Sequence, residues 1–180
     1  MAKEVLSVRE IRKEDIPSIT DYWLSSDSAF MHGMGVDTSK IPEREQWNFM
    51  LNQQLFLDYK HKKSYCLIWE VDGKAIGHSN VNPVEFGQEA HMHLHLWNVD
   101  TRKKGMGAAL VRLSLPWYFD RMELKKLYCT PYALNPAPNR TMQKVGFDFV
   151  IKQRCTPGSL NFEQEVNVWV LTCEKYQRLL

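Results

Sequence analysis

Alternating apolar and polar positions predict that much of the chain forms a sheet. The pattern places strands over residues 5–11, 65–71, 74–81, 91–99, 127–130, 147–154 and 163–172. Asp72 and Gly73 separate two of these segments, and such a pair favours a two-residue hairpin turn between antiparallel strands. The segment over residues 91–99 alternates without interruption, which is typical of a strand with two distinct faces.

Other segments repeat apolar residues every three or four positions, as an amphipathic helix requires. They cover residues 13–26, 42–59, 105–119 and 137–145. Pro116 should kink or end the third of these helices, and Gly146 is well suited to end the fourth. The segment over residues 31–37 is rich in Gly and Met, and we expect it to form a loop or a single turn.

The predicted order of elements is β-α-α-β-β-β-α-β-α-β-β. Strands joined by hairpins and then by a β-α-β crossover predict an α/β fold, with a mixed, mostly antiparallel sheet and helices on both faces. The 180 residues contain no internal repeat and no linker-like segment. We therefore expect a single domain over residues 1–180.

Composition and charge exclude several classes of partner. The 23 Lys and Arg residues nearly balance the 21 Asp and Glu residues, so the chain lacks the basic excess of a typical nucleic-acid-binding protein. No stretch is long and apolar enough to span a bilayer, and the N-terminal segment lacks the apolar core of a secretory signal. We expect no nucleic-acid partner, no membrane partner and a cytoplasmic location. In the cytoplasm we expect the four cysteines, which form no CxxC pair, to be reduced thiols. They are Cys66, Cys129, Cys155 and Cys173.

Residues 97–108, with the sequence WNVDTRKKGMGA, join the uninterrupted strand to the third helix through a turn with two glycines. The N–H groups and the dipole of a helix N-terminus favour an anion. Basic side chains at 102–104 add charge, while Gly105 and Gly107 leave room for close approach. The turn matches neither GxxxxGK(S/T) nor GxGxxG. It predicts a phosphate or pyrophosphate site; the alternative is an ordinary turn with solvated basic residues.

Two motifs resemble signatures of the GNAT N-acetyltransferase superfamily. Residues 102–107, RKKGMG, are similar to the Arg/Gln-x-x-Gly-x-Gly/Ala loop that holds the pyrophosphate of acetyl-coenzyme A (acetyl-CoA). Residues 135–147, NPAPNRTMQKVGF, are similar to the helix that packs beside the pantetheine arm, with its Asn-x-x-Ser/Ala start and Lys-x-Gly-Phe end. The predicted element order of nearly the whole chain is similar too, most of all to the ribosomal-protein and small-molecule acetyltransferase branch.

The resemblance implies a GNAT-like fold with acetyl-CoA as cosubstrate. It implies that the strand splays from its neighbour at residues 97–99, where its main chain would pair with the pantetheine amides. The amides of residues 102–107 would bind the pyrophosphate, and Asn135 would form a hydrogen bond near the pantetheine. The implied cofactor-binding residues are Trp97, Asn98, Val99, Arg102, Lys103, Lys104, Gly105, Met106, Gly107, Ala108, Asn135 and Asn139.

His91, His93 and His95 alternate along one strand and therefore point to the same side of the sheet. An imidazole, with a pKa of about 6.5, can take the proton of an attacking amine. The pair His91 and His93 resembles a histidine pair of the arylalkylamine N-acetyltransferases, so one of them is expected to be the base or to hold a water. The alternatives are a polar cavity lining, a substrate contact, satisfied core histidines or a zinc site. No carboxylate joins them, and we expect no metal.

Many GNAT members have a Tyr, the acid toward the leaving thiolate, where this sequence has Met142. Tyr128, Tyr132 and Cys129 are the candidates to replace it, and the alternative is that the thiolate leaves unassisted. Tyr128 completes the expected catalytic set. No cysteine has a nucleophile context, so direct attack of a primary amine on the thioester in a ternary complex is expected. The alternatives are a catalytically degenerate coenzyme A-binding module and an acyltransferase with a different acyl donor.

The acceptor is expected to be a small-molecule amine or a peptide or protein N-terminus. The resemblance implies that the first helices and the late hairpin select it. Trp23, Phe30, Met31, Met34 and Trp47 suit an apolar acceptor pocket, and core packing is the alternative. Dimers are common among such enzymes, and the resemblance leaves a homodimer open.

Overall fold

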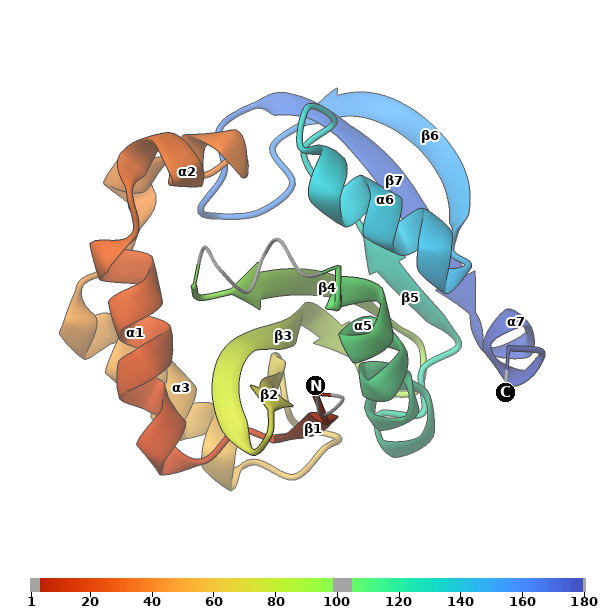
Figure 1. The fold of residues 1–180 in the computed structure, drawn as a ribbon, viewed down its shortest axis with the longest axis horizontal. Helices are drawn as coiled ribbons and strands as arrows, with labels where there is room; N and C mark the ends of the chain where they lie inside the picture. The colour runs from red at the N-terminus through yellow and green to blue at the C-terminus, as the bar shows by residue number, and fades with distance from the viewer. Residues whose placement is uncertain (1–3, 99–104, 180) are drawn as a thin grey trace.

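The computed structural model describes residues 4–98 and 105–179, which are built around a seven-stranded sheet of order β1-β2-β3-β4-β5-β7-β6 (Figure 1). The strands are β1 (Leu6–Glu10), β2 (Tyr65–Val71), β3 (Lys74–Glu85), β4 (Glu89–Leu96), β5 (Lys126–Cys129), β6 (Asp148–Cys155) and β7 (Gln164–Thr172). Neighbouring strands run antiparallel except β4 and β5, which are parallel. The expectation of a mixed, mostly antiparallel sheet is confirmed, and the single-domain interpretation of residues 1–180 stays a prediction.

Helices occupy the connections before β2, after β4, between β5 and β6, and after β7. They are α1 (Ile16–Ser25), α2 (Ser28–Gly33), α3 (Arg44–Phe56), α5 (Gly107–Pro116), α6 (Pro136–Val145) and α7 (Cys173–Gln177). Short 3-10 turns cover Lys13–Asp15 and Thr38–Lys40. α5 gives way to a π-helical turn, Trp117–Arg121, directly after Pro116, as expected because proline lacks the N–H of an α-helical bond.

The two faces of the sheet are covered by different helices (Figure 1). α5 and α6 cover one face, where Leu67 and Trp69 of β2 pack with Leu110 of α5 in a closed apolar core. α1 and α3 cover the other face, where Cys66 and Ile68 of the same strand point. The alternation along β2 therefore serves both layers, because successive side chains of a strand face opposite ways.

β4 and β5 pair only over their first residues. Their register begins with Glu89 beside Lys126 and ends with His91 beside Tyr128, although β4 continues to Leu96. The sheet is therefore split beyond this point. The resemblance implies such a divergence at residues 97–99, and the structure begins it several residues earlier.

Local turn chemistry accounts for several boundaries. Asp72 and Gly73 both have positive φ, 49° and 75°, which is the backbone of the expected two-residue hairpin turn between β2 and β3. Gly146 ends α6 with φ 111°, and its N–H donates to the carbonyl of Met142 at 3.1 Å. These positions behave as the sequence predicts because they depend on adjacent residues alone.

The expectation of a loop or single turn over residues 31–37 is wrong for its first part, which belongs to α2. The Asp27 side chain accepts a hydrogen bond from the Phe30 N–H at 3.0 Å and so caps the start of this helix. α7 was not expected either, and the Thr172 side chain caps it by accepting from the Lys175 N–H. Both missed helices are short and begin at a local cap.

Candidate active site

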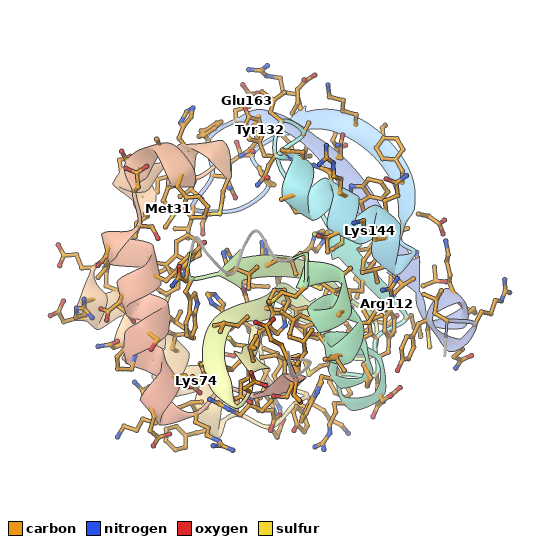
Figure 2. The ribbon with its side chains drawn as sticks, viewed as in Figure 1. Met31, Lys74, Arg112, Tyr132, Lys144 and Glu163 are labelled. Carbon is orange, nitrogen blue, oxygen red and sulfur yellow. The ribbon has the colours of Figure 1, made fainter. Side chains whose placement is uncertain are left out.

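A cavity of about 410 Å³ opens where β4 and β5 separate. Its floor is one face of β3 and β4, its wall comes from α1 and α3, and the segment after β5 and the β6–β7 connection line its far side. Figure 2 labels Tyr132, which lines the cavity from the segment after β5. The cavity therefore lies on the face of the sheet that α1 and α3 cover, next to the point where β4 and β5 separate.

Imidazoles form much of the cavity floor. β3 and β4 place His78 opposite His95 and Asn80 opposite His93, so these four side chains share one face. The rings of His78 and His95 stack with their centroids 4.6 Å apart, and the Tyr22 hydroxyl lies 3.2 Å from Nδ1 of His95. Burial lowers the pKa of His78 to about 3 and holds that of His95 well below its ordinary value. Both rings are therefore neutral, and His95 fits the interpretation of a satisfied core histidine.

His93 combines a fixed ring with a vacant basic nitrogen. Its Nε2 lies 2.9 Å from the carbonyl oxygen of Asn82, and a carbonyl only accepts, so Nε2 carries the proton and donates. Nδ1 of the neutral ring then keeps its lone pair. Burial lowers the pKa of His93, so the ring stays neutral at the pH where an ordinary imidazole begins to charge. His93 thus offers a proton acceptor in the cavity lining.

His91 and Tyr128 occupy the last paired position before the split. Their rings stack with centroids 5.2 Å apart, and burial lowers the pKa of His91. Neither residue is among the described residues that line the cavity. The structure therefore brings His93 to the cavity and leaves His91 and Tyr128 outside its described lining; the catalytic role of all three stays a prediction.

The wall of the cavity is aromatic. Trp23 of α1 and Trp47 of α3 stack with centroids 5.4 Å apart and an interplanar angle of 15°, and Met34 continues the apolar surface. The indole Nε1 of Trp47 is buried and has no hydrogen-bond partner among the described residues. Of the five residues expected in an acceptor pocket, these three line the cavity, whereas Phe30 and the fully buried Met31 (labelled in Figure 2) belong to the adjoining core.

A roof, defined here as residues 157–164, lines the cavity from the β6–β7 connection and the first residue of β7. The carbonyl oxygen of Gly35 accepts two hydrogen bonds of 2.8 Å from the roof, one from Asn161 Nδ2 and one from Gln164 Nε2. The Asp37 N–H donates to the carbonyl of Leu160, also at 2.8 Å. These contacts join segments more than a hundred residues apart, so local pattern gives no signal for them.

The N-terminus of α5 lies at the other side of the split, after the segment that carries the expected pyrophosphate loop. Gly105 has φ +69°, and a Cβ on Gly107 would meet Thr141 of α6 at 3.5 Å, an ordinary contact. Met106 is buried beneath the start of the helix, which Ala108 continues. Val99, Arg102, Lys103 and Lys104 lie outside the described residues, so their binding roles stay predictions.

Trp97 and Asn98 follow β4 and are the last described residues before Gly105. The Trp97 N–H donates to the carbonyl of Ile76 at 2.9 Å, so this main-chain group faces β3, and its indole donates to Nδ1 of His78 at 2.8 Å. Asn98 is exposed. The implied pairing of residues 97–99 with a pantetheine arm stays a prediction.

Asn135 and Asn139 organise the start of α6. Asn135 caps the helix by accepting from the Ala137 N–H at 3.3 Å, and it lines the cavity. Asn139 donates to the carbonyls of Tyr132 and Asn135 and accepts from side chains of β7, including the Trp169 indole at 2.9 Å. The Asn139 amide is therefore saturated by protein partners, which favours a positioning role, whereas Asn135 remains placed for a ligand.

Buried cysteines of the cavity keep their protons. Burial raises the pKa of Cys129 to about 12 and also raises that of Cys66, and no disulfide joins the four cysteines. Across residues 4–98 and 105–179, no three His, Cys, Asp or Glu side chains converge as metal ligands. No helix within the same ranges is long and apolar enough to cross a bilayer.

Comparison with known families identifies the fold and its class. Residues 6–148 match the model of the acetyltransferase (GNAT) domain. The chain belongs to this acetyltransferase family, and the resemblance drawn from its two motifs is confirmed. No curated protein matches the chain significantly.

Solved structures agree with the family model. Spermidine N-acetyltransferase from Vibrio cholerae, in complex with coenzyme A and spermine, has a TM-score of 0.77 and 15% identity over 96% of this chain and 98% of its own. A ribosomal L7/L12 alpha-N-protein acetyltransferase, RimL, in complex with coenzyme A, has a TM-score of 0.77 and 13% identity over 94% and 95%. An uncharacterized protein from Bacillus halodurans has a TM-score of 0.70 and 13% identity over 98% and 88%. At these identities the likeness concerns the fold.

Proposed function

We propose that the protein is an acetyl-CoA-dependent N-acetyltransferase acting on a primary amine. The observation that carries the proposal is His93, a neutral imidazole with its Nδ1 lone pair vacant, in a cavity at the split between β4 and β5. Coenzyme A complexes of two similar folds support the choice of cosubstrate. The family match supports the acetyl group, whereas the acceptor is inferred from the site.

The cosubstrate would lie along the split in the sheet. Its pyrophosphate would meet the N-terminus of α5, where N–H groups and the helix dipole favour an anion. Its pantetheine arm would extend between β4 and α6, past Asn135, toward the cavity. Gly107 suits this path because it adds no side chain at the helix start.

Proton transfer is the task of the residues on the cavity side. The amine nitrogen attacks the thioester carbonyl carbon, forming a C–N bond, and the C–S bond breaks as the thiolate leaves. Nδ1 of His93 takes the amine proton, directly or through one water, and the thiolate finally takes up a proton. Tyr132, in the cavity lining, replaces the missing family Tyr as donor, because Met142 is buried in the core.

A covalent acetyl-enzyme is disfavoured on the same geometry. The two cysteines in the lining, Cys66 and Cys129, have raised pKa values and so hold little thiolate. A thiol attacks poorly, whereas an amine relieved of its proton by His93 attacks well. Direct transfer within a ternary complex follows.

An acetylation assay tests the proposal. Mixing the protein with acetyl-CoA and a panel of primary amines should release free thiol and yield acetylated amine by mass spectrometry. Gly107→Val should weaken coenzyme A binding by at least about tenfold in calorimetry, since branched carbons would fill the space left for the phosphate. Binding without thiol release for any amine would show instead a coenzyme A-binding module, the alternative that Met142 favours.

A further inference from the structure

The cavity lining has no formal charge over the residues that the structure describes. None of the described lining residues is Asp, Glu, Lys or Arg. His78, His93 and His95 are neutral because burial lowers the pKa of each. A cation that enters this cavity therefore loses water without gaining a carboxylate from the described lining.

The same lining offers a large apolar surface. The stacked indoles of Trp23 and Trp47 form one wall, and Met34, Leu51 and Leu160 extend it toward the roof. Aromatic walls of this kind favour rings, which stack in parallel or edge to face. The Nε1 of Trp47 is buried in the same wall and has no hydrogen-bond partner among the described residues.

We propose that the acceptor is a primary amine on an apolar, ring-bearing group with no second charge, rather than a polyamine. This inference rests on the proposed function and deepens it. A polyamine would bring further ammonium groups into a cavity whose described lining holds no carboxylate, and an unpaired buried charge is costly. A monoamine brings no charge beyond that of the amine itself, which must lose its proton before the nitrogen can attack.

The enzymatic test compares matched amines. Phenethylamine should have a kcat/KM about tenfold or more above that of spermidine, because ring burial adds favourable free energy and no second charge is desolvated. Hexylamine and hexamethylenediamine have the same chain and differ by one ammonium, so hexylamine should also be preferred. Equal or better turnover of spermidine or the diamine would overturn the inference and leave the acetyltransferase proposal standing.

Two variants on α3 isolate the charge of the lining. Met50 lines the cavity, whereas its neighbour Phe49 is 64% exposed and is not among the described lining residues. Met50→Glu should raise the ratio of kcat/KM for spermidine over phenethylamine, since it supplies the missing carboxylate. Phe49→Glu is the matched control and should leave the ratio unchanged. A ratio that moves equally in both variants would contradict the inference.

Binding measured without turnover separates the two proposals. If no amine is acetylated, the acetyltransferase proposal fails, and calorimetry with the coenzyme A-loaded protein still tests the cavity. Binding of phenethylamine at least about tenfold tighter than spermidine would support the acceptor class. Tighter or equal binding of spermidine, or no binding of either amine, would overturn it.

Discussion

The two faces of the sheet differ in how closely they are packed. Beneath α5, Leu67, Trp69 and Leu110 are almost completely buried, and the indole nitrogen of Trp69 donates to the hydroxyl of Ser114 at 2.9 Å. Beneath α1 and α3, the helices stand off around a cavity, and Trp47 Nε1 is buried without a described partner. The layer beneath α5 is close-packed, and its Trp69 indole is hydrogen-bonded. The layer beneath α1 and α3 contains a cavity and a buried indole N–H without a described partner.

From this difference we expect the closed layer to contribute most of the stability and the open layer to carry recognition. Close packing and satisfied hydrogen bonds lower the free energy of the folded state. Empty volume and buried donors without a partner raise the free energy of the folded state. Such features are typical of sites where a ligand binds. Since both layers share β2, β3 and β4, substitutions can be chosen that act on one face at a time.

The largest effect on stability should come from the closed layer. Leu110→Ala should lower the free energy of unfolding by about 3 kcal/mol, because it leaves a cavity in a core that cannot collapse. Leu51→Ala, the matched change beside the existing cavity, should cost about 1 kcal/mol, because Leu51 is only half-buried. Urea unfolding measures both, and equal losses would remove the distinction between the layers.

The next effect concerns catalysis on the open layer. His93→Ala should lower kcat/KM about a hundredfold by removing the proton acceptor, while leaving coenzyme A affinity unchanged. Because the pKa of His93 is lowered, the wild-type rate should fall only below about pH 6.5, and the variant should lose that limb. His61→Ala is the control, since this exposed imidazole contacts Asp58 away from the cavity. Wild-type activity in His93→Ala would exclude His93 as the base.

His91→Ala decides between the two candidates of the strand. His91 stacks on Tyr128 outside the described lining of the cavity, so we expect its removal to reduce kcat/KM by a smaller factor than His93→Ala. A larger loss in His91→Ala would transfer the role of base to His91.

The imidazole floor should make stability depend on pH. An unfolded histidine takes up a proton near pH 6.5, whereas folded His78 stays neutral down to a pKa of about 3. The unfolded state binds more protons between these values, so the free energy of unfolding should fall by about 2 kcal/mol from pH 7 to pH 5 for His78 alone. Urea unfolding across this range measures the slope, which should be smaller in His78→Gln; an unchanged slope would contradict the assignment.

The smallest effect concerns the roof. Gly35 has φ +84°, and a Cβ there would overlap the Gln164 amide, so Gly35→Ala should cost about 1–2 kcal/mol. Gly33→Ala is the matched control, because a Cβ at Gly33 has open space and its backbone is helical. The same pair tests specificity: Gly35→Ala should raise KM for the amine and not for acetyl-CoA. An unchanged KM would separate the roof from acceptor binding.

Sequence predicted what depends on neighbouring residues. The seven strands and four longer helices occur in the predicted order, to which the structure adds the short helices α2 and α7. The Asp72-Gly73 turn and the Gly146 helix end are confirmed, and β4 carries three histidines on one strand. Sequence could not show that His78 would stack on His95, because that contact depends on the register of β3 against β4. It could not separate His93 from His91 either, since only the point where β5 diverges gives them different surroundings.

The bond pair at the Gly35 carbonyl has a consequence for biosynthesis. Its two donors, on Asn161 and Gln164, stand 126 and 129 positions later in the chain. A nascent polypeptide emerging from the ribosome therefore presents Gly35 long before the roof that binds its carbonyl has been translated. Until then the wall of Trp23 and Trp47 lacks the roof, so we expect the complete cavity to be among the last features that the molecule acquires.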